Sequence, residues 1–263
     1  MLISKIKEIF QWRQLIFSLA SRDLKAKYRQ ATGGFGWMLV RPFMQMLIFS
    51  FIFGVIFKVK IDKYPLFLLS GLFAWSFLHS SLDGALNSII NNANLIKKAY
   101  FPREILPISV ILGNLVNFLF SLIVLFSFSL FLKVPLFTAL IWLPLVILTQ
   151  IILTTGMAFL VSSLNACFRE VQFIMETLIL VWFYTSPIVY SLDMVKMSIP
   201  ENLMRFYLLN PITGIILGYQ NIFVYGLSPN LGLLLNSLFV SLICFILGFF
   251  TFRHYEGIFV DII

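Results

Sequence analysis

Long apolar segments alternate with short polar ones along most of this chain. A helix needs about 20 predominantly apolar residues to cross the roughly 30 Å hydrocarbon core of a bilayer. We therefore predict an all-α integral membrane protein with six transmembrane helices. The six segments lie near residues 36–57, 65–90, 105–132, 140–163, 172–190 and 231–252.

The arm before the first of these segments is periodic. Apolar residues recur at helical spacings, interrupted near Arg13, and basic residues fill the other faces, which is typical of an amphipathic helix in the membrane interface. Three glycines would let the backbone turn into the bilayer. We predict this interfacial helix and its connecting loop at 1–33 and the six-span domain at 34–263; a plain juxtamembrane anchor is the alternative. The apolar positions are Ile6, Phe10, Phe17, Ala20, Leu24 and Tyr28, and the glycines are Gly33, Gly34 and Gly36.

The segment between the fifth and sixth spans is apolar but repeatedly interrupted. Asn210-Pro211, Thr213-Gly214 and Gly218 would be poorly tolerated in a helix facing lipid. This favours a re-entrant outer helical hairpin near 196–226. A seventh span, which would place the C-terminus outside, is the alternative.

The loop between the second and third spans reads NNANLIKKAYFPREILP, from Asn91 to Pro107. A short apolar patch there is surrounded by basic residues, and Pro102 ends any helix. Such a short amphipathic helix would suit the docking of a soluble partner. An inert connector is the alternative.

The composition excludes an ordinary soluble domain. Of the 263 residues, 60% are hydrophobic and 11% are charged, whereas soluble domains carry about 25% charged residues. Cys167 and Cys244 belong to no CxxC or Cys/His cluster, so neither a disulfide framework nor a metal site is predicted. The net charge of +8 suits anionic partners, but in a membrane protein it also follows from the positive-inside rule.

The distribution of lysine and arginine predicts the orientation. With an even number of spans both termini lie on one side, and basic residues are more numerous in the arm, the tail and the loops of that side. This bias favours cytoplasmic termini, although Lys58, Lys60 and Lys63 in the first outer loop weaken it. The arm contains no uninterrupted apolar core, so no secretory signal is expected.

Motifs for catalysis are absent from the sequence. It contains no GxxxxGK[ST] phosphate loop, no HExxH and no carboxylate pair with the spacing of an acid/base couple. His79 and Asp83 are four residues apart in the second span, and Glu176 lies in the fifth. An ionised group there costs about 2.5–3.5 kcal/mol. Polar contacts between helices explain these residues better than a proton-coupled carrier does.

Aromatic residues gather at the outer end of the fifth span, in WFYTSPIVY. An interfacial aromatic belt is the simpler interpretation. The functional alternative is a surface on which sugar rings stack, in a glycan channel. Its candidate residues are Trp182, Phe183, Tyr184 and Tyr190, together with Trp75 in the second span.

Several blocks, in order from about residue 20 to the end, resemble one family. DLKAKYRQATGGFGWMLVRP is similar to the start of the membrane subunits of type-2 ABC exporters for bacterial polysaccharides. NANLIKKAYFPREILP, FREVQFIMETLILVWFYTSPIVY, NPITGIILGYQNIF and YEGIFVDII resemble later parts of the same subunits. One departure is Thr32 to Gly36, where a Ser-x-Leu-Gly sequence is usual.

The resemblance implies a homodimer in the bacterial cytoplasmic membrane with two copies of a separate ATPase. The partner would bind ATP and Mg²⁺, and this chain would hold no cofactor and bind no nucleic acid. The substrate would be a lipid-linked polysaccharide such as O-antigen, capsule or teichoic acid, and the re-entrant hairpin would form an outer gate. The residues expected to couple to the ATPase are Asn94, Lys97, Lys98, Tyr100, Arg103, Arg169 and Glu170.

A lipid diphosphate would need positive charge at the inner interface. Arg22, Lys25 and Arg29 follow spacings of three and four and share a helix face. Backbone N–H groups at the start of the first span suit a phosphate, and Arg41 suits bidentate contacts. We predict a diphosphate site of Arg22, Lys25, Arg29, Gly33, Gly34, Gly36, Trp37 and Arg41.

Three alternatives to polysaccharide export stay open at this stage. They are a type-2 ABC permease for a drug or another lipid, a membrane-embedded glycan-modifying enzyme and a proton-coupled carrier. A gene for an ATPase beside the gene for this chain would separate the two permease hypotheses from the others.

Overall fold

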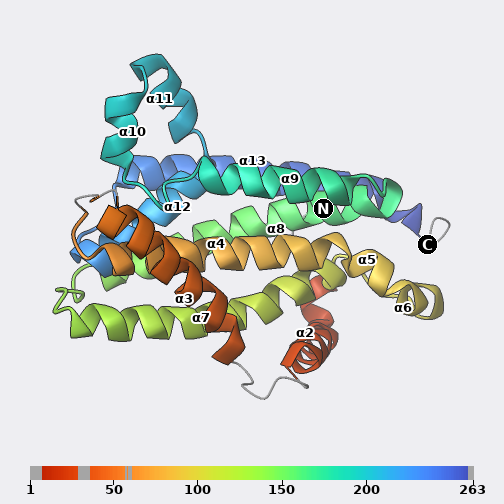
Figure 1. Ribbon diagram of the computed structural model, residues 1–263. Coiled ribbons are helices and arrows are strands. Elements are labelled where there is room, and N and C mark those ends of the chain that lie inside the picture. Colours follow the sequence, from red (N-terminus) through yellow and green to blue (C-terminus); the bar gives the residue numbers. More distant parts are fainter. Residues whose placement is uncertain (1–7, 29–35, 57, 59–60, 260–263) are drawn as a thin grey trace.

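The computed structural model describes residues 8–28, 36–56, 58 and 61–259, and all regular structure in them is helical (Figure 1). The long helices lie side by side, and shorter ones lie beside them and at the two ends of the bundle. The elements are α2 (Arg13–Tyr28), α3 (Trp37–Phe49), η2 (Ser50–Ile56), α4 (Tyr64–Leu86), α5 (Ser88–Asn91), α6 (Ala93–Lys98), α7 (Ile105–Phe131), η3 (Leu140–Trp142), α8 (Leu143–Cys167), α9 (Val171–Tyr184), α10 (Leu192–Ser198), α11 (Glu201–Leu208), α12 (Pro211–Gln220), η4 (Asn221–Tyr225) and α13 (Leu231–Glu256).

Four helices are long and apolar enough to cross a membrane. They are Tyr64–Leu86, Ile105–Phe131, Leu140–Cys167 and Leu231–Glu256, and they match four of the six predicted spans. The other two predicted spans correspond to shorter apolar helices, Pro42–Ile56 and Val171–Tyr184. Helix α9 ends before the predicted limit at residue 190, because Pro187 disfavours a helical conformation at the residue before it.

Helices α8 and α13 pack with their backbones in contact. A Cβ atom added to Gly156 would lie 2.5 Å from the backbone of Phe245, and one added to Gly248 would meet the carbonyl of Gly156. Small residues at a helix crossing allow this approach in membrane proteins, where close packing replaces the hydrophobic effect as the driving force.

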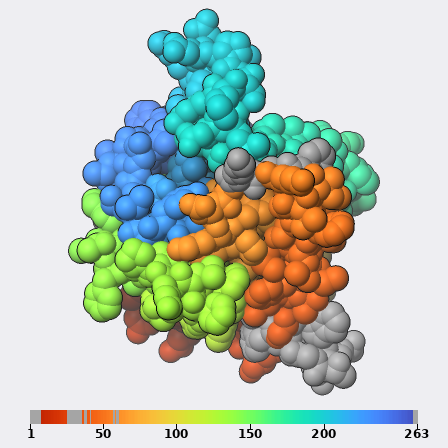
Figure 2. Space-filling view, turned by 60° about the vertical axis from the view of Figure 1, so that its left-hand side comes forward, coloured from red at the N-terminus to blue at the C-terminus, as the bar shows by residue number. Residues whose placement is uncertain are grey.

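Residues 192–225 form two distinct parts at one end of the bundle, which we name the outer end. Helices α10 and α11 project sideways from the bundle, and Figure 2 shows them standing away from the rest of the surface. After the break at Asn210-Pro211, α12 and η4 return into the core, where Thr213, Tyr219 and Gln220 are buried. The Asn210 side chain accepts a hydrogen bond from the backbone N–H of Ile212 and so caps α12.

Buried hydrogen bonds fix α12 in the core. The Tyr219 hydroxyl donates to Oε1 of Gln150 on α8 at 2.7 Å, and Nε2 of Gln150 donates in turn to the Ala74 carbonyl of α4 at 2.7 Å. A third bond joins Nε2 of Gln220 to the Pro187 carbonyl, after α9, at 2.9 Å. Since all three side chains are buried, these bonds hold α12 firmly against α8, which is itself bonded to α4.

Helix α2 lies within the arm predicted to be helical, but it buries only part of the predicted apolar stripe. Ala20 is buried and lies against α7 at Gly113, together with Leu24, whereas Phe10 and Phe17 are each 64% exposed. Gly36 has φ −58° and ψ −33°, a helical conformation that any residue adopts, so no glycine is required there. Gly33 and Gly34 lie outside the described residues.

A second apolar core lies at the opposite, inner end of the bundle. It joins α2, the α6–α7 loop, α8, α13 and the tail. Its members are Ile16, Leu19, Ile89, Ile96, Phe101, Ile105, Leu106, Phe159, Ala166, Phe249, Phe252 and Phe259. The segments predicted to face the cytoplasm therefore pack together.

Candidate functional site

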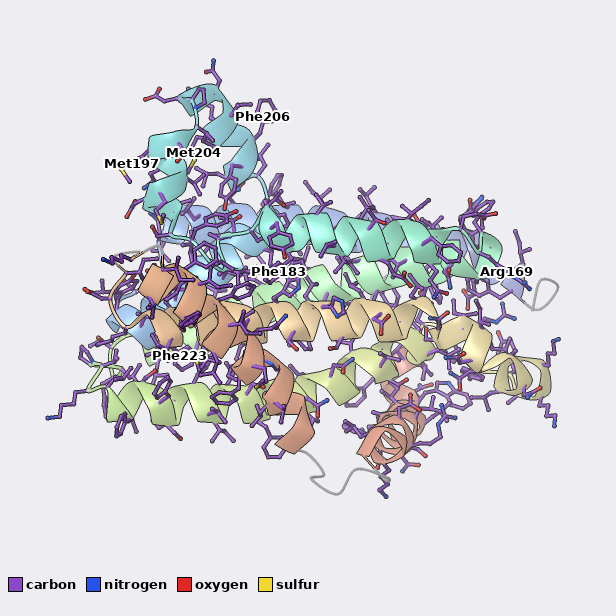
Figure 3. All side chains as sticks on the ribbon, in the orientation of Figure 1. Arg169, Phe183, Met197, Met204, Phe206 and Phe223 are labelled. Atoms are coloured by element: carbon purple, nitrogen blue, oxygen red, sulfur yellow. The ribbon has the colours of Figure 1, made fainter. Side chains whose placement is uncertain are left out.

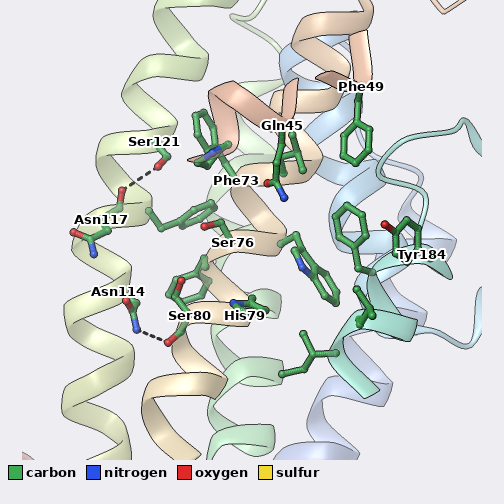
Figure 4. A pocket seen from close by; sticks show the side chains of 18 of the residues that line it. Gln45, Phe49, Phe73, Ser76, His79, Ser80, Asn114, Asn117, Ser121 and Tyr184 are labelled. Atoms are coloured by element: carbon green, nitrogen blue, oxygen red, sulfur yellow. Dashed lines mark hydrogen bonds between the residues drawn. The ribbon is translucent and has the colours of Figure 1, made fainter. Parts of the chain in front are cut away.

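A cavity of about 610 Å³ lies between α3, α4, α7 and α9 (Figure 4). Its lining combines aromatic and polar residues, and each of the four helices contributes both kinds. The aromatic residues are Phe49, Phe73, Trp75, Phe77, Phe118, Phe183 and Tyr184. The polar residues are Gln45, Ser76, His79, Ser80, Asn114, Asn117, Ser121 and Glu176.

Ring contacts between helices fix the aromatic residues of the cavity in place. Trp75 of α4 meets Phe183 of α9 edge-on at 5.6 Å between centroids, and Phe49 of α3 stacks on Phe183 at 6.3 Å. Such pairs contribute about 0.5–1.5 kcal/mol each beyond the area that they bury. The contacts therefore fix three helices around the cavity.

Three of the five predicted channel aromatics line this cavity, namely Trp75, Phe183 and Tyr184. The other two support it. The Trp182 indole N–H donates to Oδ1 of Asn210 at 2.8 Å and so joins α9 to the start of α12. The Tyr190 hydroxyl donates to the Tyr184 carbonyl at 2.8 Å.

A second cavity of about 390 Å³ lies between α2, α4, α5 and α7. Its lining shares His79, Ser80 and Asn114 with the first cavity, so the two cavities are neighbours on either side of these residues. Nδ2 of Asn114 donates to the Ser80 carbonyl at 3.1 Å, which joins α7 to α4 at the same level. Together the cavities lead from α2 at the inner end to the aromatic residues in the middle of the bundle.

The predicted diphosphate residues are only partly located. Arg22 lines the second cavity, where its guanidinium lies 2.9 Å from Oδ1 of Asp23 and donates to Oδ1 of Asn92 at 3.0 Å. Lys25 is exposed one turn further along α2. Gly36, Trp37 and Arg41 lie at the start of α3, and the side chains of the last two are not described; Arg29, Gly33 and Gly34 lie outside the described residues.

The predicted coupling residues lie at the inner end, and all except the half-buried Arg103 are exposed. Asn94, Lys97 and Lys98 lie on α6, and Tyr100 follows it with 92% of its surface exposed. A hollow of about 280 Å³ is lined by residues 96–101 and Arg103, and the Arg103 guanidinium donates to the carbonyl of Glu256 at the end of α13. Arg169 and Glu170 are exposed in the α8–α9 turn, and Figure 3 shows Arg169 at the same end of the molecule as α6.

Residues 14–224 match the family described as ABC-2 type transporter. This chain belongs to that family. It is also similar to proteins named O-antigen export system permease protein RfbA. One from Myxococcus xanthus is 31% identical over 87% of each chain, and two from Klebsiella pneumoniae are 32% identical over 89% of this chain and 86% of theirs, and 30% identical over 95% of each chain.

The polar lining of this ABC-2 transporter was not predicted from the sequence as a site. Its signal is nevertheless present. Polar residues recur at helical spacing within apolar spans, as Ser76, Ser80 and Asp83 on α4 and as Asn114, Asn117 and Ser121 on α7. Individually they suggest contacts between helices, and only the structure places both sets along two neighbouring cavities.

Proposed function

We propose that this chain is the permease subunit of an ATP-driven ABC exporter that moves a lipid-linked polysaccharide, such as O-antigen, across the bacterial cytoplasmic membrane. The observation that carries the proposal is the similarity, over 87–95% of the chain, to proteins named as O-antigen export permeases. The cavity is consistent with it. Sugars have apolar CH faces that pack on aromatic rings and hydroxyl groups that need polar partners.

The proposed membrane domain has six spans. The helical run from Trp37 to Ile56 covers 20 residues, or about 30 Å, and would cross as the first span. The shorter α9 would be the fifth, completed by the turns after Tyr184. Both termini would then be cytoplasmic, which agrees with the packing of α2, α6 and the tail in one core. The domain boundaries at residues 1–33 and 34–263 remain part of this proposal.

The segment 192–225 would be the re-entrant hairpin and outer gate. Helices α10 and α11 are exposed, whereas α12 and η4 are buried, α12 is bonded to α8 through Tyr219, and η4 is bonded to α7 through the Phe223 carbonyl. The moving part of such a gate would therefore be α10 and α11, with Asn210-Pro211 as its hinge.

Energy would come from a partner, because the sequence contains no phosphate loop. We infer a homodimer of this chain with two ATPase subunits, which bind ATP and Mg²⁺. The ATPase would engage Asn94, Lys97, Lys98, Tyr100 and Arg103, with Arg169 and Glu170 as a second contact; all of these except the half-buried Arg103 are exposed at the inner end.

The lipid diphosphate would be admitted between α2 and the start of α3. Arg22 lines the inner cavity and Pro42, next to Arg41, lines the first, so both segments border the path. Arg29 and Arg41 would supply charge, and the N–H groups of Gly33, Gly34, Gly36 and Trp37 would bind phosphate oxygens.

The test is ATP hydrolysis by the purified chain with its ATPase in nanodiscs. We expect a polyprenyl-diphosphate-linked glycan from the host cells to raise the rate, and deletion of the gene to remove that glycan from the cell surface. Stimulation by an unrelated lipid or drug, with none by the glycan lipid, would favour the other permease function and contradict polysaccharide export.

A further inference from the structure

Polar residues of α4 and α7 line the two neighbouring cavities, and we name this polar strip the α4–α7 groove. It consists of Ser76, Ser80 and Asp83 on α4 and Asn114, Asn117 and Ser121 on α7. Asp83 is exposed and most of the others are partly exposed. Asp83 lies one turn before the inner end of α4, where a carboxylate facing lipid costs less than at the centre of a span but is still unfavourable, so this face is expected to meet water or a polar ligand.

The groove reaches well into the bundle. At 1.5 Å per residue, Ser76 is about 18 Å from the outer start of α4, and Asn117 is about 18 Å from the inner start of α7. Both therefore lie near the middle of a roughly 30 Å core. The groove thus extends from the inner end to the level of Trp75 and Phe183, which line the same cavity.

The charges in the groove disfavour a phosphate as its ligand. The inner cavity holds two carboxylates, Asp23 and Asp83, against the single guanidinium of Arg22, which is already paired with Asp23. A diphosphate would be repelled by Asp83. Hydroxyl groups are different, because they donate to carboxylates and amide oxygens and accept from amide N–H groups.

Asn117 extends the polar lining to the middle of α7, where it borders the first cavity next to Phe118. Its Oδ1 atom has no hydrogen-bond partner among the described residues, but it is enclosed by protein, so it reaches a ligand in the cavity only if the side chain turns. An enclosed acceptor without a donor costs about 1–3 kcal/mol, a cost that a turn toward a ligand hydroxyl or water would remove.

We propose that the α4–α7 groove binds the hydroxyl groups of the sugars next to the lipid diphosphate, with Asp83, Asn114 and Asn117 selecting the glycan. This inference rests on the proposed function and assigns the sugar and the phosphate to different places. The diphosphate stays at Arg29 and Arg41, the first sugars bond to the groove, and their CH faces pack on Trp75 and Phe183.

Thiol labelling tests this assignment in the complete transporter, in nanodiscs that leave both faces open. Cys167 and Cys244 are first replaced by alanine, and ATPase stimulation by the glycan lipid is confirmed. Asn117→Cys is then compared with Val116→Cys, which is partly exposed at the same depth on α7 but lines neither cavity. The label is a small hydrophilic methanethiosulfonate, and the two probes are polyprenyl diphosphate and the polyprenyl-diphosphate-linked glycan.

We expect faster labelling at Asn117→Cys than at Val116→Cys. The glycan lipid at roughly ten times its dissociation constant should slow it about tenfold, and polyprenyl diphosphate should leave it unchanged. Equal labelling of the two cysteines, or protection by polyprenyl diphosphate alone, overturns the inference. Stimulation of the ATPase without protection by the glycan lipid overturns the inference but not the proposed function, whereas absence of stimulation in the unsubstituted complex overturns both.

Discussion

At the scale of single residues, Arg22 holds the most informative position. Its guanidinium bonds to Asn92 between α5 and α6, so it ties the helix proposed to receive substrate to the segment proposed to receive the ATPase. We therefore expect Arg22 to have a mechanical role besides its charge. Because one side chain serves both, a charge-only experiment would not separate the two roles.

Removing Asn92 separates them, because Asn92→Ala breaks the bond and leaves the charge of Arg22. We expect both Asn92→Ala and Arg22→Ala to lower glycan export, and the double variant to lose little more than Arg22→Ala alone. A surface bond to a charged group contributes about 1 kcal/mol, which corresponds to roughly a fivefold change in rate. Export rates in proteoliposomes measure this cycle. Wild-type export by Asn92→Ala would show that the bond has no role in coupling.

The candidate residues also show what a sequence can predict at this scale. Trp75, Phe183 and Tyr184 were identifiable as aromatic candidates, and the structure places them around one cavity. The groove could not be predicted, since polar residues such as Asn114 and Asn117 usually make contacts between helices, and their role is not evident until the neighbours of α7 are known. A periodic pattern defines the face of a helix but not what lies opposite it.

At the scale of elements, the lengths and breaks of helices can be predicted from the sequence, but the contacts between helices cannot. The long spans followed from apolar length, and the break before α12 followed from Asn210-Pro211. The burial of Ala20 on α2, with Phe17 left exposed, could not be predicted from the sequence, because it depends on the close contact of α2 with α7 at Gly113. Tertiary contacts decide which apolar face of an amphipathic helix faces protein and which faces lipid.

The α8–α13 crossing permits a direct test of element packing. In Gly248→Ala the new methyl group would overlap the Gly156 carbonyl, and we expect a loss of about 1–3 kcal/mol of stability from the forced separation of the helices. Gly257→Ala is the control, since it is helical with open space around its Cβ position. Thermal unfolding in detergent measures both. Equal melting temperatures for both variants would mean that the contact does not limit stability.

At the scale of the whole molecule, the inner core joins all the segments that an ATPase would move. Ile96 of α6, Phe101, Phe159 of α8 and Phe252 of α13 share this core with Phe259 of the tail. Buried aromatic contacts of this kind move as one body, because packed cores do not deform continuously. The tail would therefore transmit motion from the α6 region to α13.

Phe259 tests this transmission because it is fully buried and its ring lies 5.5 Å from that of Phe252. We expect Phe259→Ala to lower glycan export while ATP hydrolysis and association with the ATPase persist, since the loss is of packing inside this chain. Its neighbour Ile258 is 42% exposed, so Ile258→Ala should leave the ratio of export to hydrolysis unchanged. Both rates, measured in the same proteoliposomes, give that ratio. Equal ratios for the two variants would place the coupling route elsewhere, whereas a fall confined to Phe259→Ala ties the tail to export.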